Sequence, residues 1–231
     1  MELENPCLDF GMFTNQPEVM HDFYSGKLGL NFQGTTPMGP KFKLSRYQLK
    51  GSVLKLWHAA DPLPPRAAAG YKSLTITDPD TSAPRTMSDP DGNQLVFVPS
   101  GHNQVDQLEF QVGVSDVALF DRFYGDVLGA ERIGGGRYRL GRTMLSVSAD
   151  TGARQVKTEP LTNPLDAVAA MSGIGLRYLT IQVRDGAAEY PRVIGKGVNP
   201  GVALITGAGP LPALFMVRDP DGNWVEILQR K

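Results

Sequence analysis

The sequence lacks the features that direct a chain to a membrane, to nucleic acid or to an oxidising compartment. It has one cysteine, Cys7, so no disulfide framework can form within it. Its 23 basic and 24 acidic residues leave a formal net charge of −1, which gives no basic field to attract nucleic acid. No apolar run approaches the ~20 residues of a membrane span, and the acidic start "MELENPCLDF" does not resemble a signal peptide. We therefore expect a cytoplasmic protein whose partner is a small molecule or another protein.

Two corners of identical sequence are present instead. The pentapeptide "DPDGN" occurs at residues 89–93 and again at 219–223, and a short apolar run follows each copy. Proline fixes its own φ, the aspartates can accept backbone N–H groups, and glycine takes a positive φ. Each copy therefore predicts a tight turn that leads into a closing strand.

A second repeat has a period of 100 residues. The dipeptide Phe-Tyr at 23–24 recurs at 123–124, and Leu-Gly at 28–29 recurs at 128–129. Each copy follows a helix-capping type of residue and carries apolar residues at helical spacing. Each ends at a glycine suited to the left-handed stop conformation. The repeat predicts two equivalent helices, one in each half of the chain.

Alternating runs around these helices predict strands, and further strand starts occur at 71–78 and 178–185. The sequence thus predicts an α+β fold of four βαβββ modules in two pairs, which form domains at 1–102 and 103–231. The second module is truncated, since the interval before its corner is too short for a helix and a full set of strands. The Pro-rich and polar stretches at 59–70 and 150–164 are expected to be linkers between modules.

Two segments carry a resemblance to a known family. "DPDGNWVEIL" and "VSDVALFDRFYGDVLG" resemble the vicinal oxygen chelate superfamily, which includes glyoxalase I, extradiol dioxygenases and the fosfomycin- and bleomycin-resistance proteins. The resemblance implies that paired modules curve into two half-open barrels, each around a pocket. In metal-dependent members, the first and last strands of the modules hold a divalent ion that binds adjacent oxygens of the substrate.

The resemblance assigns two carboxylates to the metal site. The ligand on the last strand lies three residues after the Asn of the corner, which gives Glu226 in the second half and Val96 in the first. The ligand on a first strand lies seven residues before the helix start, which gives Glu109. Glu109 and Glu226 are thus the expected metal ligands and catalytic residues, and one of them could also act as the base. Oxygen donors favour Mg²⁺, Mn²⁺ or Ca²⁺, and the superfamily also leaves Ni²⁺, Zn²⁺ and Fe²⁺ open.

The same count assigns a ring of substrate-binding residues. In the other modules, the residue seven positions before the helix start is Tyr178 in the fourth, Tyr71 in the second and Asp9 in the first. Residues two apart on a strand share a face, so Trp224 should lie beside Glu226 in the pocket. An indole there would bind a flat or aliphatic part of a ligand. The expected substrate-binding residues are Tyr178, Trp224, Tyr71 and Trp57.

The histidines depart from the pattern of the iron enzymes in this family. His21, His58 and His102 lie on none of the ligand positions, which disfavours an extradiol-type dioxygenase with two histidine ligands. Two functions remain open at this point. One is a metal-dependent lyase or isomerase, which the acid pair favours. The other is a metal-free binding protein of the bleomycin-resistance kind, which the missing histidines favour. In both cases we expect the first half to be a scaffold or a homodimer surface.

Overall fold

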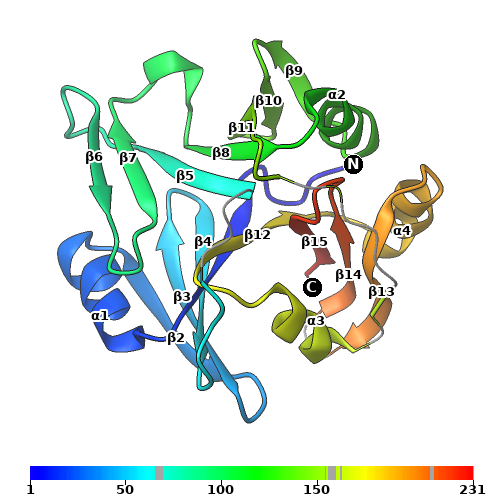
Figure 1. Cartoon of the computed structure of the whole chain (residues 1–231), viewed down its shortest axis with the longest axis horizontal. Coiled ribbons are helices and arrows are strands. Elements are labelled where there is room, and N and C mark those ends of the chain that lie inside the picture. Colours follow the sequence, from blue (N-terminus) through cyan, green and yellow to red (C-terminus); the bar gives the residue numbers. More distant parts are fainter. Residues whose placement is uncertain (66–69, 154, 156–159, 162, 209–210, 231) are drawn as a thin grey trace.

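The computed structural model describes the whole chain except residues 66–69, 154, 156–159, 162, 209–210 and 231. The described residues form one sheet of eight strands and one of seven, with short helices packed against them (Figure 1). No helix in the described part of the chain is long and apolar enough to cross a membrane.

The eight-stranded sheet has the order β13-β14-β15-β12-β1-β4-β3-β2. Its strands are β1 (Asp9–Thr14), β2 (Asn31–Pro37), β3 (Phe42–Leu49), β4 (Ser52–Ala59), β12 (Gly175–Gln182), β13 (Asn199–Ala208), β14 (Leu211–Arg218) and β15 (Trp224–Gln229). The two modules in this sheet meet at its centre, where β1 and β12 pair antiparallel. Within each module the first strand pairs parallel with the last, β1 with β4 and β12 with β15.

The seven-stranded sheet repeats this plan in the order β6-β7-β5-β8-β11-β10-β9. Its strands are β5 (Gly70–Thr77), β6 (Arg85–Ser88), β7 (Gln94–Val98), β8 (Leu108–Val114), β9 (Glu131–Gly134), β10 (Arg137–Leu140) and β11 (Thr143–Ala149). Here β5 and β8 form the central antiparallel pair. The second module consists of β5, β6 and β7, and no helix occurs between Gly70 and Val98, all of which the structure describes.

The hydrogen-bonded pairing of modules differs from the pairing expected from the sequence. The sequence places modules one and two together in residues 1–102, and modules three and four in 103–231. The sheets instead join the first module with the fourth and the second with the third. The physical reason is that antiparallel pairing of first strands is a long-range choice, which the local strand and helix patterns do not specify.

The two repeated helices lie where the 100-residue period predicts them. Each begins as a short α-helix and continues as a π-helical segment: α1 (Pro17–His21) with η1 (Asp22–Lys27), and α2 (Val117–Phe120) with η3 (Asp121–Val127). Asp116 caps the second helix by accepting from the N–H groups of Ala118 and Leu119. The glycine after each helix has a positive φ, 67° at Gly29 and 80° at Gly129, as a left-handed stop requires.

Two further helices and a 3₁₀ turn complete the fold. Helix α4 (Gly186–Ile194) occupies the position expected for the helix of the fourth module, and its N-cap is Asp185. Helix α3 (Pro164–Met171) follows the expected linker and was not predicted from the sequence. The 3₁₀ turn η2 (His102–Gln104) connects β7 to β8.

The main core lies between the sheets and the helices, and it contains apolar side chains such as Phe10, Phe110 and Ile227. A smaller cluster occupies the other face of the eight-stranded sheet. There Ala167, Val168 and Met171 of α3 pack with aromatic residues of β1, β4, β12 and β15. Alternation along each strand therefore sends one set of side chains to the helices and the other set to the inner face of the sheet.

Candidate functional site

The strand that follows the corner at residues 219–223 places Glu226 on the inner face of the eight-stranded sheet. Val225 and Ile227 point into the main core, so Glu226 points to the opposite face. In the strand register Glu226 lies beside Thr180, and Thr180 lies beside Asp9. Three oxygen-bearing side chains from β1, β12 and β15 are thus aligned across the centre of this face.

Lys55 on β4 reaches into this row and completes what we call the Glu226 cluster: Asp9, Lys55, Thr180 and Glu226. The ammonium group of Lys55 forms an ion pair with Oε2 of Glu226 and donates to Oγ1 of Thr180 at 2.8 Å. The Thr180 hydroxyl in turn donates to Oε2 of Glu226 at 2.6 Å. The side chains of Lys55 and Glu226 are only 6% and 15% exposed, so water screens their attraction weakly.

Asp9 is the second carboxylate of the cluster, and it is held by two neutral hydrogen-bond donors and by the more distant guanidinium group of Arg230, whose Nη2 lies 3.9 Å from Oδ2. Its oxygens accept from the backbone N–H of Val53 at 2.8 Å and from Nε2 of Gln182 at 2.7 Å. Burial raises the pKa of Asp9 above its ordinary value, and the positive charge of Lys55 opposes that shift. Lys55 therefore lies near both carboxyl groups of this face, and Arg230 adds a second cation at Asp9.

The Glu226 cluster does not fit a divalent metal ion. Oε2 of Glu226 is already bound to the Lys55 ammonium group and to the Thr180 hydroxyl. A lysine in this place supplies the positive charge that a metal ion would bring, and its three N–H donors have no lone pair to ligate one. The donor set thus favours an internal ion pair over metal binding at Glu226.

The aromatic residues expected to bind substrate pack against one another beside this cluster. Trp57 stacks on Phe13 at 5.6 Å between ring centroids, and its Nε1–H donates to the Tyr178 hydroxyl at 2.8 Å. Trp224 and Tyr178 belong to the cluster that α3 covers. Burial, and then the charge of Glu226, raise the pKa of Tyr178 well above its ordinary value, so its hydroxyl stays protonated. These three rings are buried and pack with the apolar side chains of α3.

Tyr71 lies on β5, in the other sheet. Its hydroxyl donates to the backbone oxygen of Trp224 at 3.1 Å, which links β5 to β15 across the two sheets. Burial is also the main cause that raises the pKa of Tyr71 above its ordinary range. Tyr71 thus acts as a structural tie between the sheets.

Glu109 occupies the equivalent position on the inner face of the seven-stranded sheet. Its register neighbour on β5 is Thr75, which in turn lies beside Val96 on β7. This row matches Asp9, Thr180 and Glu226, so Val96 stands where the other sheet has its acid. We call this region the Glu109 cup. It is a cavity of about 230 Å³ whose polar wall includes Ser73, Thr75, Glu109 and Gln111.

The carboxylate of Glu109 is fixed by two donors. Oε1 accepts from the guanidinium group of Arg137, with Nε at 3.2 Å and Nη2 at 3.1 Å. It also accepts from the Ser146 hydroxyl at 2.5 Å. As in the Glu226 cluster, a cationic side chain neutralises the acid, and the set does not match a metal site.

The structure separates the two acids that the sequence analysis placed in one site. Glu109 lies in the seven-stranded sheet and Glu226 in the eight-stranded sheet, and each has its own cationic partner. This placement corrects the expectation that the two carboxylates share one metal or one reaction centre. Trp57, Tyr178 and Trp224 do lie together beside Glu226.

The histidines lie apart from both acid rows. His21 is on α1, His58 is near the end of β4, and His102 is in η2 at the Glu109 cup. Within the described residues no three His, Cys, Asp or Glu side chains are grouped so that they could hold a metal ion. The donors for an iron site of two histidines and one carboxylate are therefore not assembled there.

Sequence reasoning missed Lys55, Thr180 and Arg137. A signal for Lys55 was present, because strand alternation in "SVLKLWHA" places it on the same face as Trp57, with leucines on the opposite face. Thr180 is two residues after Tyr178 on the same face of β12. The count back from the helix start therefore selected the correct face, but it selected Tyr178 instead of the next residue on that face, Thr180. No comparable signal marks Arg137 in the sequence.

Comparisons with known proteins agree with this architecture. A family model described as Glyoxalase/Bleomycin resistance protein/Dioxygenase superfamily matches residues 104–227. Glyoxalase I from Zea mays is similar in structure, with a TM-score of 0.69 and 13% identity over 96% of this chain and 92% of that chain. A "putative dioxygenase" from Bacillus subtilis gives a TM-score of 0.67 and 14% identity over 100% of this chain and 85% of that chain. No curated protein matches the sequence significantly. These likenesses confirm the expected α+β fold of paired modules.

Proposed function

Because the chain belongs to the glyoxalase, bleomycin resistance protein and dioxygenase superfamily, whose family model matches more than half of it, we propose that it binds a small polar organic molecule in the Glu109 cup without a metal ion. The membership confirms the resemblance that "DPDGNWVEIL" and "VSDVALFDRFYGDVLG" carry. The single observation that supports the proposal is the cavity in front of Glu109, where a carboxylate is already neutralised by Arg137.

The wall of the cup suits a ligand with several hydrogen-bonding groups. It combines a carboxylate, two hydroxyls and an amide, from Glu109, Ser73, Thr75 and Gln111. Ligand pockets usually have volumes of 300 Å³ or more, so a cavity of about 230 Å³ favours a compact molecule. Since Arg137 already balances the charge of Glu109, the ligand need not supply a cation.

The rim of the cup supports a binding role because its backbone is strained. Asn103 and Gln104 both have positive φ, 48° and 62°, which costs a residue other than glycine roughly 1–3 kcal/mol. Arg137 donates from Nη2 to the backbone oxygen of Asn103 at 2.6 Å. One guanidinium group thus ties the strained rim to the acid in the cup, and such strain is concentrated at functional sites.

The metal-dependent lyase or isomerase considered from the sequence receives no support from the donor sets. Glu226 is paired with Lys55, and Glu109 is paired with Arg137. A metal ion at either acid would first have to displace a cation from a carboxylate that is largely shielded from water. We therefore favour the metal-free alternative, which leaves the identity of the ligand to experiment.

Thermal denaturation with added Mg²⁺, Mn²⁺, Ni²⁺ or Zn²⁺ tests the metal-free part of the proposal. A site in the native state would add about 2.7 kcal/mol at a metal concentration one hundred times its Kd. We expect no rise in melting temperature with any of the four ions. A rise that disappears in Glu226→Gln or Glu109→Gln would restore the metal-dependent enzyme.

Ligand-observed NMR with a library of small neutral hydrogen-bonding fragments tests the cup. We expect fragments to bind the wild type and to lose binding to Glu109→Gln. The matched control is Glu131→Gln, since Glu131 lies in the same sheet and is paired with Arg139 but is 66% exposed. Fragments that bind both variants equally well would exclude the Glu109 cup as their site.

A further inference from the structure

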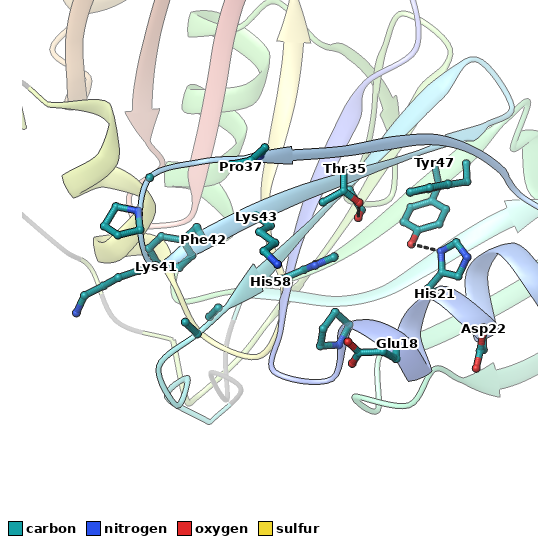
Figure 2. A pocket seen from close by; sticks show the side chains of 17 residues that line it. Glu18, His21, Asp22, Thr35, Pro37, Lys41, Phe42, Lys43, Tyr47 and His58 are labelled. Atoms are coloured by element: carbon teal, nitrogen blue, oxygen red, sulfur yellow. Dashed lines mark hydrogen bonds between the residues drawn. The ribbon is translucent and has the colours of Figure 1, made fainter.

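A larger cavity lies on the helix-covered face of the eight-stranded sheet, away from the Glu226 cluster and from the Glu109 cup. Its volume is about 600 Å³, which is within the range of small-molecule sites. Helix α1 forms one wall and strands β2, β3 and β4 form the other (Figure 2). We call this cavity the α1 cleft. His58 of β4 lines the α1 cleft. Residues three apart on a strand point to opposite faces, so the α1 cleft and Lys55 lie on opposite faces of β4.

Strand alternation places polar groups on the sheet side of the α1 cleft. Lys43, Ser45 and Tyr47 of β3 all point into it, and His58 of β4 lies directly opposite Lys43 in the strand register. Figure 2 shows Lys43 and His58 projecting side by side from neighbouring strands toward α1. An ammonium group and an imidazole ring are thus adjacent within one cavity.

Neither of these two groups forms a hydrogen bond or an ion pair with the described residues. Nε2 of His58 is buried and forms no hydrogen bond there. Lys43 forms no ion pair in that part of the chain, whereas Lys41, at the same cleft, is paired with Asp61 at 2.7 Å. A buried nitrogen without a partner is unfavourable, and a ligand acceptor that met it after a small movement of the ring would remove that cost.

The remaining walls are largely apolar. Pro17 of α1 and Pro37 and Pro40 around the β2–β3 turn line the cleft. Phe32 also lines it and is 40% exposed, which is unusual for a large apolar side chain. An apolar body would bury this surface while an acidic group reached the sheet.

We propose that the α1 cleft binds a small organic monocarboxylate, with its carboxylate at Lys43 and His58 and its apolar part against Phe32 and the prolines. The ammonium group supplies charge, and the imidazole supplies a directed N–H donor. Glu18 and Asp22 on the helix side face the same cavity. They repel a second negative charge, so the cleft selects monocarboxylates over dicarboxylates.

The state of His58 is consistent with this geometry. Burial lowers the pKa of His58, Glu18 opposes that shift, and Lys43 and His21 add to it. The free protein therefore carries a neutral imidazole near pH 7, which can present one N–H to the ligand. His21 does not compete for that role, since its Nδ1 is hydrogen-bonded to the Tyr47 hydroxyl at 3.0 Å.

Isothermal titration calorimetry with phenylacetate as the probe tests the proposal on the full-length protein. We expect phenylacetate to bind, and both phenylacetamide and phenylmalonate to bind at least roughly tenfold more weakly, as the loss of a charge-assisted contact or the addition of a repelled charge predicts. Lys43→Gln should weaken phenylacetate binding by a similar factor. Lys43 is exposed, so this variant should fold normally.

Two further variants test whether the charges around the cleft act on the ligand as proposed. Lys41→Gln is the matched control, because Lys41 lines the same cleft but is already neutralised by Asp61, and it should change binding by less than about twofold. Glu18→Gln should tighten phenylacetate binding by about two- to threefold, since it removes a repulsive charge. Backbone amide NMR should place the shifted signals around residues 43 and 58.

The proposal would be overturned by an absence of phenylacetate binding at millimolar concentration, by equal binding of phenylacetamide, or by binding that Lys43→Gln leaves unchanged. The result is independent of the Glu109 cup, because Glu109→Gln should leave phenylacetate binding intact. A loss of binding in Glu109→Gln would place the probe in the cup and remove the α1 cleft as its site.

Discussion

The hydroxyl of Tyr24 donates a hydrogen bond to Oδ2 of Asp89 at 2.7 Å. Tyr24 belongs to the helix of the first module, and Asp89 begins the corner that closes the second. In the other half, Tyr124 donates to Oδ2 of Asp219 at 3.4 Å. The two repeats visible in the sequence, Phe-Tyr and DPDGN, therefore meet in space, and they tie together modules that do not share a sheet.

Removal of the Tyr24 hydroxyl should destabilise the fold. Burial raises the pKa of Asp89, and the hydrogen bonds from Asn93 and Tyr24 oppose that shift by favouring the carboxylate. A hydrogen bond to a charged group contributes about 1.5–3 kcal/mol, so Tyr24→Phe should lower the free energy of unfolding by that amount. Urea denaturation at pH 7 measures it. Tyr190→Phe is the control, because Tyr190 packs edge-on against Phe215 through its ring, and it should change the free energy by less than about 0.5 kcal/mol.

The ion pair between Lys55 and Glu226 should be costly to break and much less costly to replace as a whole. Lys55→Met leaves Glu226 without its cation and near Asp9, and the loss of one partner of a buried pair costs about 3–5 kcal/mol. The double variant Lys55→Met/Glu226→Leu removes both charges, so we expect it to be more stable than Lys55→Met alone. Urea denaturation of the two single variants and the double variant gives the coupling free energy. A coupling near zero would mean that the two charges do not stabilise each other.

Replacement by alanine should lower the stability of the fold at Gly11 and raise it at Gly26. A Cβ atom at Gly11 would lie 1.8 Å from Cε1 of Tyr178, so the ring that bonds Trp57 would have to move. Overpacking of this kind costs about 1–3 kcal/mol. A Cβ atom at Gly26, in η1, would meet nothing within 4 Å, and alanine there should add about 0.5–1 kcal/mol by favouring the helix. Melting temperatures of Gly11→Ala and Gly26→Ala check both signs, and a stable Gly11→Ala would show that Tyr178 can relocate freely.

The parts of the fold that could be predicted from the sequence are those encoded locally. Period-two and helical patterns mark strands and helices within a few residues, and the chemistry of Pro and Gly marks the corners. The same local rule put Trp224 and Glu226 on one face, as the structure has them. The pairing of modules could not be predicted from these local patterns, because it depends on which first strands pair with each other. In the structure β1 pairs with β12 and β5 pairs with β8.

The chemistry of the candidate sites was harder to predict from the sequence for the same reason. Lys55 and Glu226 are 171 residues apart in the chain, and no local pattern states that their charges meet. Once the acids are known to lie in different sheets, the expected pair of metal ligands becomes two separate ion pairs. Helix α3 also packs on the aromatic cluster, a contact between distant segments that the local patterns around Trp57, Tyr178 and Trp224 do not state.

The corner at Asp219 should give the protein a pH-dependent stability. Burial raises the pKa of Asp219 to about 6, although Asn223 and other donors oppose the shift, whereas in the unfolded chain the pKa is near 3.9. Between these values the folded state holds a proton that the unfolded state has released. Stability from this group is therefore complete below about pH 4 and is lost as the pH rises to about 6. The loss is about 2–3 kcal/mol, at 1.36 kcal/mol for each pKa unit.

The comparison of wild type with Asp219→Asn isolates this group from other titrations. The free energy of unfolding, measured by urea denaturation at intervals from pH 4 to pH 7, should show a difference between the two proteins that changes between pH 4 and 6 and is constant above. The wild type should lose stability relative to the variant as the pH rises, because only the wild type must ionise a buried carboxyl group. Asp61→Asn is the control, since Asp61 is 65% exposed and paired at the surface with Lys41. A difference that grows in favour of the wild type as the pH rises would mean that the hydrogen bonds from Asn223 and Asp221 outweigh burial at this corner.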